Sequence, residues 1–320
     1  MQVLLSLIFF VGFAAKLSDA FRYHVPVAIA LAGFGVHLYT LRNIPPRPGD
    51  DHYIKLASSR FPSSSTTAEF PLKGQRAIIT GSSGGLGKEI ASELYSLGCD
   101  VILAARNRDK LEEAALDIRT NRPESEQIAS IIIIQLDTSD LDAVSDFATK
   151  FESDYSSLDW LVNNAGIHYA SGAVNQTYTS KQGFDMAFAT NYLGHFLLTE
   201  LLTPLLDRTG EKRGVNTRIV NIASTYHAQS DGSMLRNKPP YASRGDVNDF
   251  FHREAAYGNN KLAQILHAKE VMRRRKHSHV EMVSVCPGWV ATEILPKNLI
   301  GSFVKKRAFS PKAGALAGMM

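Results

Sequence analysis

The sequence predicts an α/β fold in which a doubly wound parallel sheet carries helices on both faces. The first observation is a strand-like run over 76–79, followed by a glycine turn over 80–87 and a helix-like stretch over 88–97. The second is that further strand-like runs alternate with amphipathic stretches of helix length, which is typical of βα units. The third is size, because 320 residues with 44% hydrophobic and 21% charged side chains suffice for one large core. We therefore expect one Rossmann-type domain over residues 71–320.

The glycine turn has the order of residues that a dinucleotide site requires. Gly81 lets the chain turn sharply, Gly85 lets the backbone approach a pyrophosphate, and Gly87 lets the helix pack close to the strand. The phosphates would lie at the positive end of that helix. An ordinary strand-to-helix loop is the alternative, but the flanking strand and helix argue against it. The predicted cofactor contacts of this turn are Gly81, Ser83, Gly85, Leu86, Gly87 and Lys88.

A second group of polar residues further along the chain predicts proton-transfer chemistry. Tyr257 and Lys261 are four residues apart, so on the helix expected over about 253–274 both side chains leave from one face. A tyrosine titrates near pH 10, and a nearby lysine ammonium with a positively charged cofactor would lower its pKa toward neutrality. Ser224 ends a strand-like run over 218–223, where its hydroxyl could donate to a substrate oxygen. Together these groups would stabilise charge on a carbonyl or alcohol oxygen during hydride transfer.

This ordered set of motifs resembles the short-chain dehydrogenase/reductase family over roughly residues 71–295. The stretch 191–199 and the long interval from Ser224 to Tyr257 resemble the retinol dehydrogenase-like and membrane-associated members. The resemblance implies that Asn191 shapes the backbone of its helix and holds a water for proton relay. The family pattern TGxxxGxG, NNAG, Asn, Ser and YxxxK corresponds here to residues 80–87, 163–166, Asn191, Ser224 and Tyr257 to Lys261.

Each of these residues, taken alone, also has a structural interpretation. A tyrosine and a lysine four residues apart are common on helices, and Ser224 alone could be a strand-end residue or a helix cap. His195 lies inside an apolar helix-like stretch and is expected to be a packing residue. His227 could reach the substrate, but a structural role is favoured for it. The coincidence of five motifs in order is what favours a catalytic site.

The residue after the strand-like run 100–105 predicts the choice of cofactor. An acidic residue there would bind the ribose 2′-hydroxyl of NAD, whereas this chain has Arg106. A guanidinium can pair with the 2′-phosphate of NADP in a fork geometry, and Lys88 beside the glycine turn could add a second positive charge. Both side chains could instead be solvated. The sequence favours NADP(H) over NAD(H).

The resemblance assigns further cofactor contacts to three segments and to the catalytic helix. A pair of residues after the strand-like run 131–136 resembles the adenine contact, and the NNAG motif would line the ribose. A Pro-Gly turn and a threonine follow the strand-like run 280–285. In the family, such a turn and threonine hold the nicotinamide carboxamide. A Pro-Gly turn without this role is the alternative. These expected contacts are Asp137, Thr138, Asn164, Ala165, Gly166, Tyr257, Lys261, Pro287, Gly288, Val290 and Thr292.

Two mostly apolar stretches, 1–15 and 25–41, precede the predicted domain. Each is shorter than the roughly 20 residues of a spanning helix. Three interpretations are therefore open: a membrane hairpin, one membrane span preceded by an interfacial segment, or a cleaved signal peptide. The first stretch lacks the basic region of a signal peptide, which favours an uncleaved membrane anchor over 1–44 and a linker over 45–70. Arg42 fits a cytosolic catalytic domain. Membrane-associated relatives usually lie on the endoplasmic reticulum or lipid droplets, and the resemblance implies the same here.

Charge and cysteine content argue against other classes of protein. The net charge is only +4, and the basic run 273–277 falls at a predicted helix end, where cations suit the dipole. A solvated surface is therefore favoured over a nucleic-acid or membrane patch, and no nucleic-acid partner is expected. Cys99 and Cys286 lie in separate strand contexts, so no disulfide or metal site is expected, and they favour a reducing compartment only weakly.

Two departures from the family pattern qualify this interpretation. The interval from Ser224 to Tyr257 is long and resembles an insertion over the substrate cleft. About thirty residues follow Pro287-Gly288, so we expect the last strand of the family's sheet to be missing. Part of the sheet edge that often forms a homodimer would be missing with it. We expect an NADP(H)-dependent oxidoreductase for a lipophilic alcohol or carbonyl, such as a retinoid, steroid or fatty aldehyde. The alternatives are a non-catalytic nucleotide-binding or interaction protein and an inactive, C-terminally shortened form.

Overall fold

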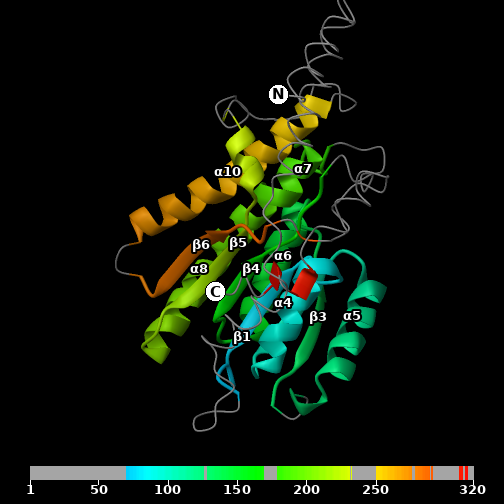
Figure 1. The fold of residues 1–320 in the computed structure, drawn as a ribbon. Coiled ribbons are helices and arrows are strands. Elements are labelled where there is room, and N and C mark those ends of the chain that lie inside the picture. The colour runs from blue at the N-terminus through cyan, green and yellow to red at the C-terminus, as the bar shows by residue number, and fades with distance from the viewer. Residues whose placement is uncertain are drawn as a thin grey trace, which may run out of the picture. The chain divides into compact units, whose positions relative to one another are not determined.

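A parallel sheet of six strands organises the structure, in the order β3-β2-β1-β4-β5-β6 (Figure 1). The computed structural model describes residues 70–125, 128–168, 179–230, 232, 250–275, 278–288, 290, 310–312 and 314–315. The five strand-like runs named above form strands, and a sixth strand ends in the NNAG motif, which confirms the predicted α/β class. The strands are β1 (Arg76–Thr80), β2 (Asp100–Ala105), β3 (Ile131–Gln135), β4 (Trp160–Asn163), β5 (Thr217–Ile222) and β6 (Val280–Val285).

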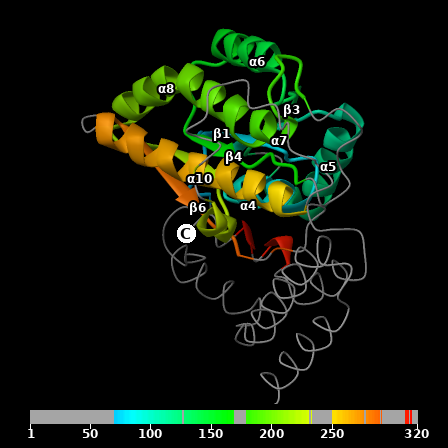
Figure 2. The same cartoon turned by 90° about the horizontal axis from the view of Figure 1, so that it is seen from above.

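Helices join successive strands and cover both faces of the sheet (Figure 2). Such crossover helices let neighbouring strands run parallel, because the chain must return to the same end of the sheet. The helix predicted over about 253–274 is confirmed, with a slightly earlier start. The main helices are α4 (Gly85–Ser96), α5 (Arg108–Asn121), α6 (Leu141–Asp154), α7 (Met186–Phe188), α8 (Gly194–Arg213) and α10 (Phe250–Arg274).

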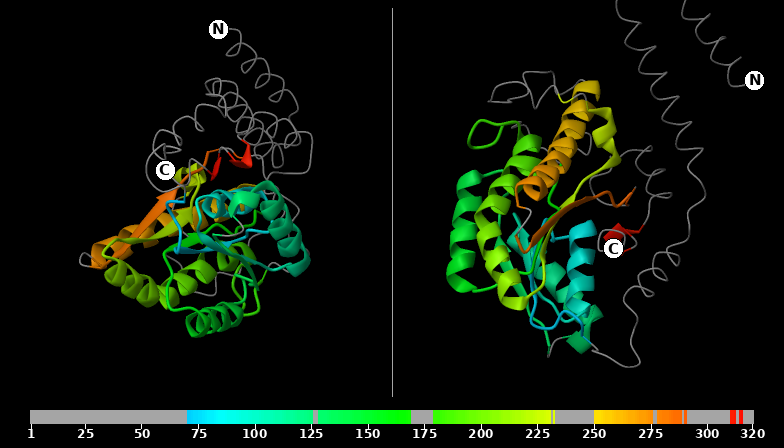
Figure 3. Two further views of the ribbon diagram at one scale, coloured as in Figure 1. Left: turned by 90° about the horizontal axis from the view of Figure 1, so that it is seen from below. Right: turned by 90° about the vertical axis from the view of Figure 1, so that its left-hand side faces the viewer.

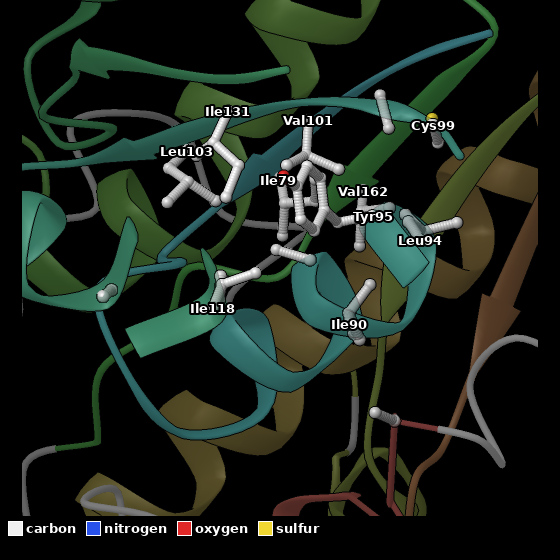
Figure 4. Close-up of a cluster of buried hydrophobic side chains, with 14 of the residues drawn as sticks. Ile79, Ile90, Leu94, Tyr95, Cys99, Val101, Leu103, Ile118, Ile131 and Val162 are labelled. Carbon is white, nitrogen blue, oxygen red and sulfur yellow. The ribbon is translucent and has the colours of Figure 1, made fainter. Parts of the chain in front are cut away.

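Alternating strand residues divide the core into two clusters. In β1, Ala77 and Ile79 belong to the cluster under α4 and α5, whereas Ile78 belongs to the cluster under α6, α8 and α10. All three side chains are fully buried, as expected for a central parallel strand covered on both sides. Figure 4 shows Ile90 and Leu94 of α4 among the strand side chains of the first cluster.

The change in strand order between β1 and β4 determines where a ligand can bind. The chain crosses from β1 to β2 and β3 on one side, and then returns to β4 on the other side of β1. In such open sheets, ligands bind at this switch point, beyond the carboxyl ends of the strands. The glycine turn and the NNAG motif follow β1 and β4 directly, so both lie at this edge.

A short C-terminal segment packs against α4, as both panels of Figure 3 show in red and cyan. Ala315 is fully buried in the cluster under α4, and a Cβ added to Gly314 would lie 2.6 Å from Val290 Cγ2 and 3.4 Å from Leu86 Cδ1. Lys312 Nζ lies 3.8 Å from the Glu93 carboxylate. The described residues of this segment therefore lie beside α4 both near its start, at Leu86, and in its second half, at Glu93.

Several predictions concern residues outside the described ranges. These are the anchor over 1–44, most of the linker over 45–70 and most of the long interval before Tyr257. Within the described part of the chain, no helix has the length and apolar character needed to cross a membrane, and no cluster of three His, Cys, Asp or Glu side chains could hold a metal. Of the two cysteines, Cys99 is buried and Cys286 is exposed.

Candidate active site

The glycine turn is held in direct contact with the NNAG segment. Gly81 and Gly85 have positive φ values of 66° and 55°, a conformation that glycine adopts without the strain of a Cβ. A Cβ added to Gly87 would lie 2.5 Å from both the Gly81 carbonyl oxygen and Asn164 Nδ2, and one added to Gly81 would lie 2.8 Å from Ala165 Cα. The absence of side chains at Gly81 and Gly87 therefore lets α4 and the glycine turn pack directly against the NNAG segment.

Thr80 connects this turn to the NNAG segment through its side chain. Its Oγ1 accepts hydrogen bonds from Asn164 N at 2.9 Å and Ala165 N at 3.0 Å. In return, Asn164 Nδ2 donates to the Thr80 carbonyl at 2.8 Å. These hydrogen bonds join the end of β1 to the loop after β4. Gly166, the last residue of the NNAG motif, is partly exposed.

Asn191 lies in a π-helical turn, Ala189–Leu193, between α7 and α8. Its side chain is fully buried and clamps the loop after the NNAG motif, since Oδ1 accepts from Ile167 N at 2.8 Å and Nδ2 donates to Ile167 O at 3.0 Å. Its main-chain carbonyl accepts from His195 Nδ1 at 3.1 Å and from Gln264 Nε2 at 2.9 Å. Wider π-turns of this kind occur frequently at functional sites.

Tyr257 and Lys261 project from the same face of α10, as their spacing predicts. Lys261 Nζ lies 5.5 Å from the centroid of the Tyr257 ring and donates to the carbonyl of Ile222, the last residue of β5, at 2.7 Å. Burial lowers the pKa of Lys261 to about 8, because a low-dielectric environment disfavours its charged form. The ammonium is therefore a buried cation beside a phenol.

Ser224 follows β5 and caps the 3-10 helix Thr225–Gln229, so its side-chain oxygen accepts from Tyr226 N at 3.3 Å. A hydroxyl that accepts a hydrogen bond keeps its own proton available for donation. The capping interpretation and a catalytic role are thus compatible. His227 turns back to the same segment, where its Nδ1 donates to the Ser224 carbonyl at 2.7 Å, which fits the structural role favoured for it.

Two aromatic side chains that the sequence analysis did not single out surround Tyr257. The His168 ring lies 4.7 Å from the Tyr257 ring, edge to face at 87°. The Tyr226 ring lies 5.7 Å away at 79°. Edge-to-face pairs at these distances are favourable beyond their buried area. The positions of His168 just after the NNAG motif and of Tyr226 just after Ser224 were the available signals in the sequence.

The two predicted phosphate-binding cations are in different environments. Arg106 follows β2 with an exposed side chain, and its main-chain carbonyl accepts from Gln135 Nε2 at 2.7 Å. Lys88 lies in the first turn of α4, and its Nζ is 2.7 Å from the Asp117 carboxylate on α5. The carboxylate offsets the charge of Lys88, which leaves Arg106 as the stronger candidate for a 2′-phosphate.

The other predicted cofactor contacts lie at the same edge, except Thr292, which is outside the described residues. Asp137 Oδ1 accepts from the backbone and hydroxyl of Ser139 at 2.9 and 2.7 Å, and Thr138 is buried. After β6, Gly288 has a φ of 77° and Val290 is buried. Ser83 is partly exposed and Leu86 is buried in the turn, and Pro287 is partly exposed.

Comparisons with known proteins agree with this arrangement. A family model described as short chain dehydrogenase matches residues 75–243. Retinol dehydrogenase 13 of Homo sapiens is 34% identical over 229 residues, which are 70% of this chain and 61% of the relative. Short-chain dehydrogenase TIC 32 B, chloroplastic, of Brassica napus is 33% identical over 262 residues, which are 79% and 76% of the two chains. The match with the human relative thus spans less than two thirds of its length.

A solved structure shows the same fold at lower identity. The short-chain dehydrogenase from Sphingobium yanoikuyae in complex with NADPH superposes with a TM-score of 0.57, 19% identity, and coverage of 77% of this chain and 83% of that chain. Likeness at this identity concerns the fold alone. Because the family model covers more than half of the sequence, and the glycine turn, NNAG segment, π-turn and Tyr–Lys helix meet at one sheet edge, the chain belongs to the short chain dehydrogenase family.

Proposed function

We propose that the protein is an oxidoreductase that transfers a hydride between NADP(H) and a lipophilic alcohol or carbonyl compound. The observation that carries this proposal is the buried ammonium of Lys261, 5.5 Å from the Tyr257 ring centroid on one helix face. A protein that only binds nucleotides has no need for a buried cation beside a phenol. The family and its retinol dehydrogenase relatives support the same reaction class.

The residues at the sheet edge fit a dinucleotide cofactor. A Cβ added to Gly84, which precedes α4, would meet no described atom within 4 Å, so a pyrophosphate could reach the amino terminus of α4. The predicted adenine, ribose and carboxamide contacts are at the carboxyl ends of β3, β4 and β6. Bound there, the nicotinamide would supply or accept the hydride.

The protein's own residues would manage the proton. In the oxidation direction, the Tyr257 phenolate takes the proton of the substrate hydroxyl, and Ser224 donates a hydrogen bond to the same oxygen. The Lys261 ammonium stabilises the phenolate by charge, since opposite charges favour the ionised form of an acid. Asn191 holds the loop at Ile167 in place. In reduction, Tyr257 returns the proton.

Preference for NADP(H) rests on Arg106. Its exposed guanidinium follows β2, at the position where an acidic residue would bind the ribose of NAD. A planar guanidinium can contact a phosphate through two parallel hydrogen bonds. The substitution Arg106→Asp should therefore weaken NADPH binding and strengthen NADH binding, as measured by quenching of protein fluorescence. An unchanged ratio of the two dissociation constants would contradict the assignment.

The substrate class and location extend this proposal. The apolar stretches 1–15 and 25–41 would hold the catalytic domain at a membrane or lipid-droplet surface, with the endoplasmic reticulum as the expected site. Lipophilic substrates concentrate there, and the names of the retinol dehydrogenase relatives agree with such a substrate. A homodimer stays a further prediction.

Tyr257→Phe tests the proposal on the full-length chain in detergent or vesicles. Turnover of retinal, a steroid ketone and a fatty aldehyde would be followed by NADPH absorbance, together with NADPH binding by fluorescence. We expect at least a hundredfold loss of turnover with unchanged NADPH affinity. Retained NADPH binding without any wild-type turnover would instead favour the non-catalytic alternative.

A further inference from the structure

The rings of His168 and Tyr226 enclose the ring of Tyr257 from two directions. The three ring centroids form a triangle with sides of 4.7, 5.7 and 6.4 Å. Every pair meets edge to face, at interplanar angles of 87°, 79° and 69°. Because the two neighbouring rings lie in different directions from the Tyr257 ring, each of them limits a different movement of that ring.

His168 is carried on a fixed piece of backbone. It follows Ile167, whose N–H and carbonyl both bind the side chain of Asn191, at 2.8 and 3.0 Å. The His168 side chain is also buried, with only 9% exposure. Its ring therefore has little room to turn away from Tyr257, although the two residues belong to segments far apart in the sequence.

Tyr226 contacts both residues whose hydroxyls are assigned to the substrate oxygen. Its ring packs against Tyr257, and its backbone N–H donates to Ser224 Oγ at 3.3 Å. The short 3-10 helix that carries Tyr226 is itself attached to α10, because Ser230 Oγ, at the end of that helix, donates to Asn259 Oδ1. Tyr226 thus relates the place of one hydroxyl to that of the other.

The contact with Lys261 leaves the direction of the phenol open. Lys261 Nζ lies 5.5 Å from the centroid of the Tyr257 ring, and its hydrogen bond goes to the Ile222 carbonyl. A cation near a ring attracts the ring but does not fix the two torsions of a tyrosine side chain. Tyr257 is partly exposed, and its hydroxyl has to come within hydrogen-bond reach of the substrate oxygen. The orientation of its ring therefore needs a further restraint.

We propose that His168 and Tyr226 are positioning residues that hold the Tyr257 ring in the orientation in which its hydroxyl meets the substrate oxygen beside Ser224. Both act through the shape of their rings, and neither transfers a proton. Edge-to-face ring pairs are favourable beyond the area that they bury, so an aliphatic side chain of similar bulk does not replace them. This inference rests on the proposed function in so far as Tyr257 and Ser224 handle the proton there.

Two variants at each position separate the ring from its polar atoms. His168→Phe and Tyr226→Phe keep an aromatic ring, whereas His168→Leu and Tyr226→Leu keep only apolar bulk. Both variants at Tyr226 keep the backbone donor to Ser224. Phe151→Leu is the matched control, because the Phe151 ring is fully buried and pairs with Tyr155 within α6, at a centroid distance of 4.8 Å.

The expected results separate turnover from folding and cofactor binding. His168→Leu and Tyr226→Leu should each lower kcat about threefold to tenfold, the range expected for one aromatic pair, with unchanged NADPH affinity. The two phenylalanine variants should keep the wild-type kcat. Phe151→Leu should lower the melting temperature and leave kcat unchanged. The two positions are tested separately, so a variant that does not fold at one of them leaves the test at the other.

Two outcomes of these kinetics would overturn the inference. Wild-type kcat in a folded His168→Leu or Tyr226→Leu protein would mean that the ring of Tyr257 needs no such support. A His168→Phe protein as slow as His168→Leu would mean that the imidazole nitrogens matter and that the shape of the ring does not.

Fluorine NMR follows the Tyr257 ring without any need for turnover. The full-length protein would be labelled with 3-fluorotyrosine, and the Tyr257 signal assigned by its loss in Tyr257→Phe. The neighbouring rings should displace this signal from that of free fluorotyrosine. In His168→Leu the signal should move toward the free value and become narrower, whereas in His168→Phe it should stay displaced. An unchanged signal in His168→Leu would contradict the inference even in an active enzyme. Conversely, the expected signals in a protein without turnover would refute only the proposed function.

Discussion

The substitution Gly87→Ala tests whether the close approach of α4 to the NNAG segment is required. The added Cβ would lie 2.5 Å from the Gly81 carbonyl oxygen and from Asn164 Nδ2, about 0.9 Å closer than ordinary contact. Both neighbours are fixed, since Gly81 N donates to Ala104 O at 2.7 Å and Asn164 Nδ2 donates to Thr80 O at 2.8 Å. The helix or the loop must therefore move.

The magnitude follows from three opposing effects. Overpacking in a rigid site destabilises by about 1–3 kcal/mol, and displacing Asn164 from its bonds to Thr80 and Gly81 costs about 1 kcal/mol for each bond. Alanine in place of glycine within a helix returns about 1 kcal/mol. The net loss in the free energy of unfolding is about 3 kcal/mol, which for a domain of this size lowers the melting temperature by about 10 °C.

Differential scanning fluorimetry and NADPH titration measure this effect, with Gly84→Ala as the control. Gly84 lies in the same turn, its φ of 175° is open to any residue, and an added Cβ meets no described atom within 4 Å. We expect Gly84→Ala to stay within about 1 kcal/mol of the wild type and Gly87→Ala to bind NADPH at least about tenfold more weakly, a difference of about 1.4 kcal/mol. Equal melting temperatures and affinities for the two variants would refute the reasoning.

Three further predictions concern charge and packing. The pKa of His195 falls from 6.5 to about 4 on folding, so the unfolded chain binds this proton first as pH falls. Urea melts should therefore show that His195 lowers the free energy of unfolding by about 3 kcal/mol between pH 6.5 and pH 4. The variant His195→Asn should lack this pH-dependent loss. Asp117→Asn removes the carboxylate that pairs with the Lys88 ammonium. It should tighten NADPH binding about twofold to fivefold at low salt, whereas NADH binding in the same titration should not change. Leu161→Ala, at a fully buried position, should lower the free energy of unfolding by about 2–5 kcal/mol, while Leu116→Ala, at 66% exposure, should change it by less than about 0.5 kcal/mol.

The fold was predictable because its signals are local. Each of the six strands is a short apolar run that can be seen in a window of a few residues, and the spacing of Tyr257 and Lys261 places them on one helix face whatever the rest of the chain does. The glycine turn was recognisable for the same reason. Local patterns therefore sufficed for the sheet and for the common face of the Tyr–Lys pair.

The polar contacts beneath the site were not predictable, because they join residues far apart in sequence. Gln264 meets Asn191 across 73 positions, and Lys88 meets Asp117 across 29 positions. No periodicity or motif specifies such partners, which depend on how α8, α10 and the sheet pack together. His195 illustrates the difference: its burial was predicted from the apolar stretch around it, but its two hydrogen-bond partners were not.

The contrast between the two cysteines gives the native sequence a built-in attachment point for a probe. Cys99 is buried, and burial together with nearby carboxylates raises its pKa, so little thiolate forms there for a maleimide or iodoacetamide reagent to attack. Cys286 is exposed and immediately precedes the Pro287-Gly288 turn assigned to the cofactor. A fluorophore or spin label would thus enter at one position without mutagenesis and report, in real time, on whether that turn orders as the nucleotide arrives.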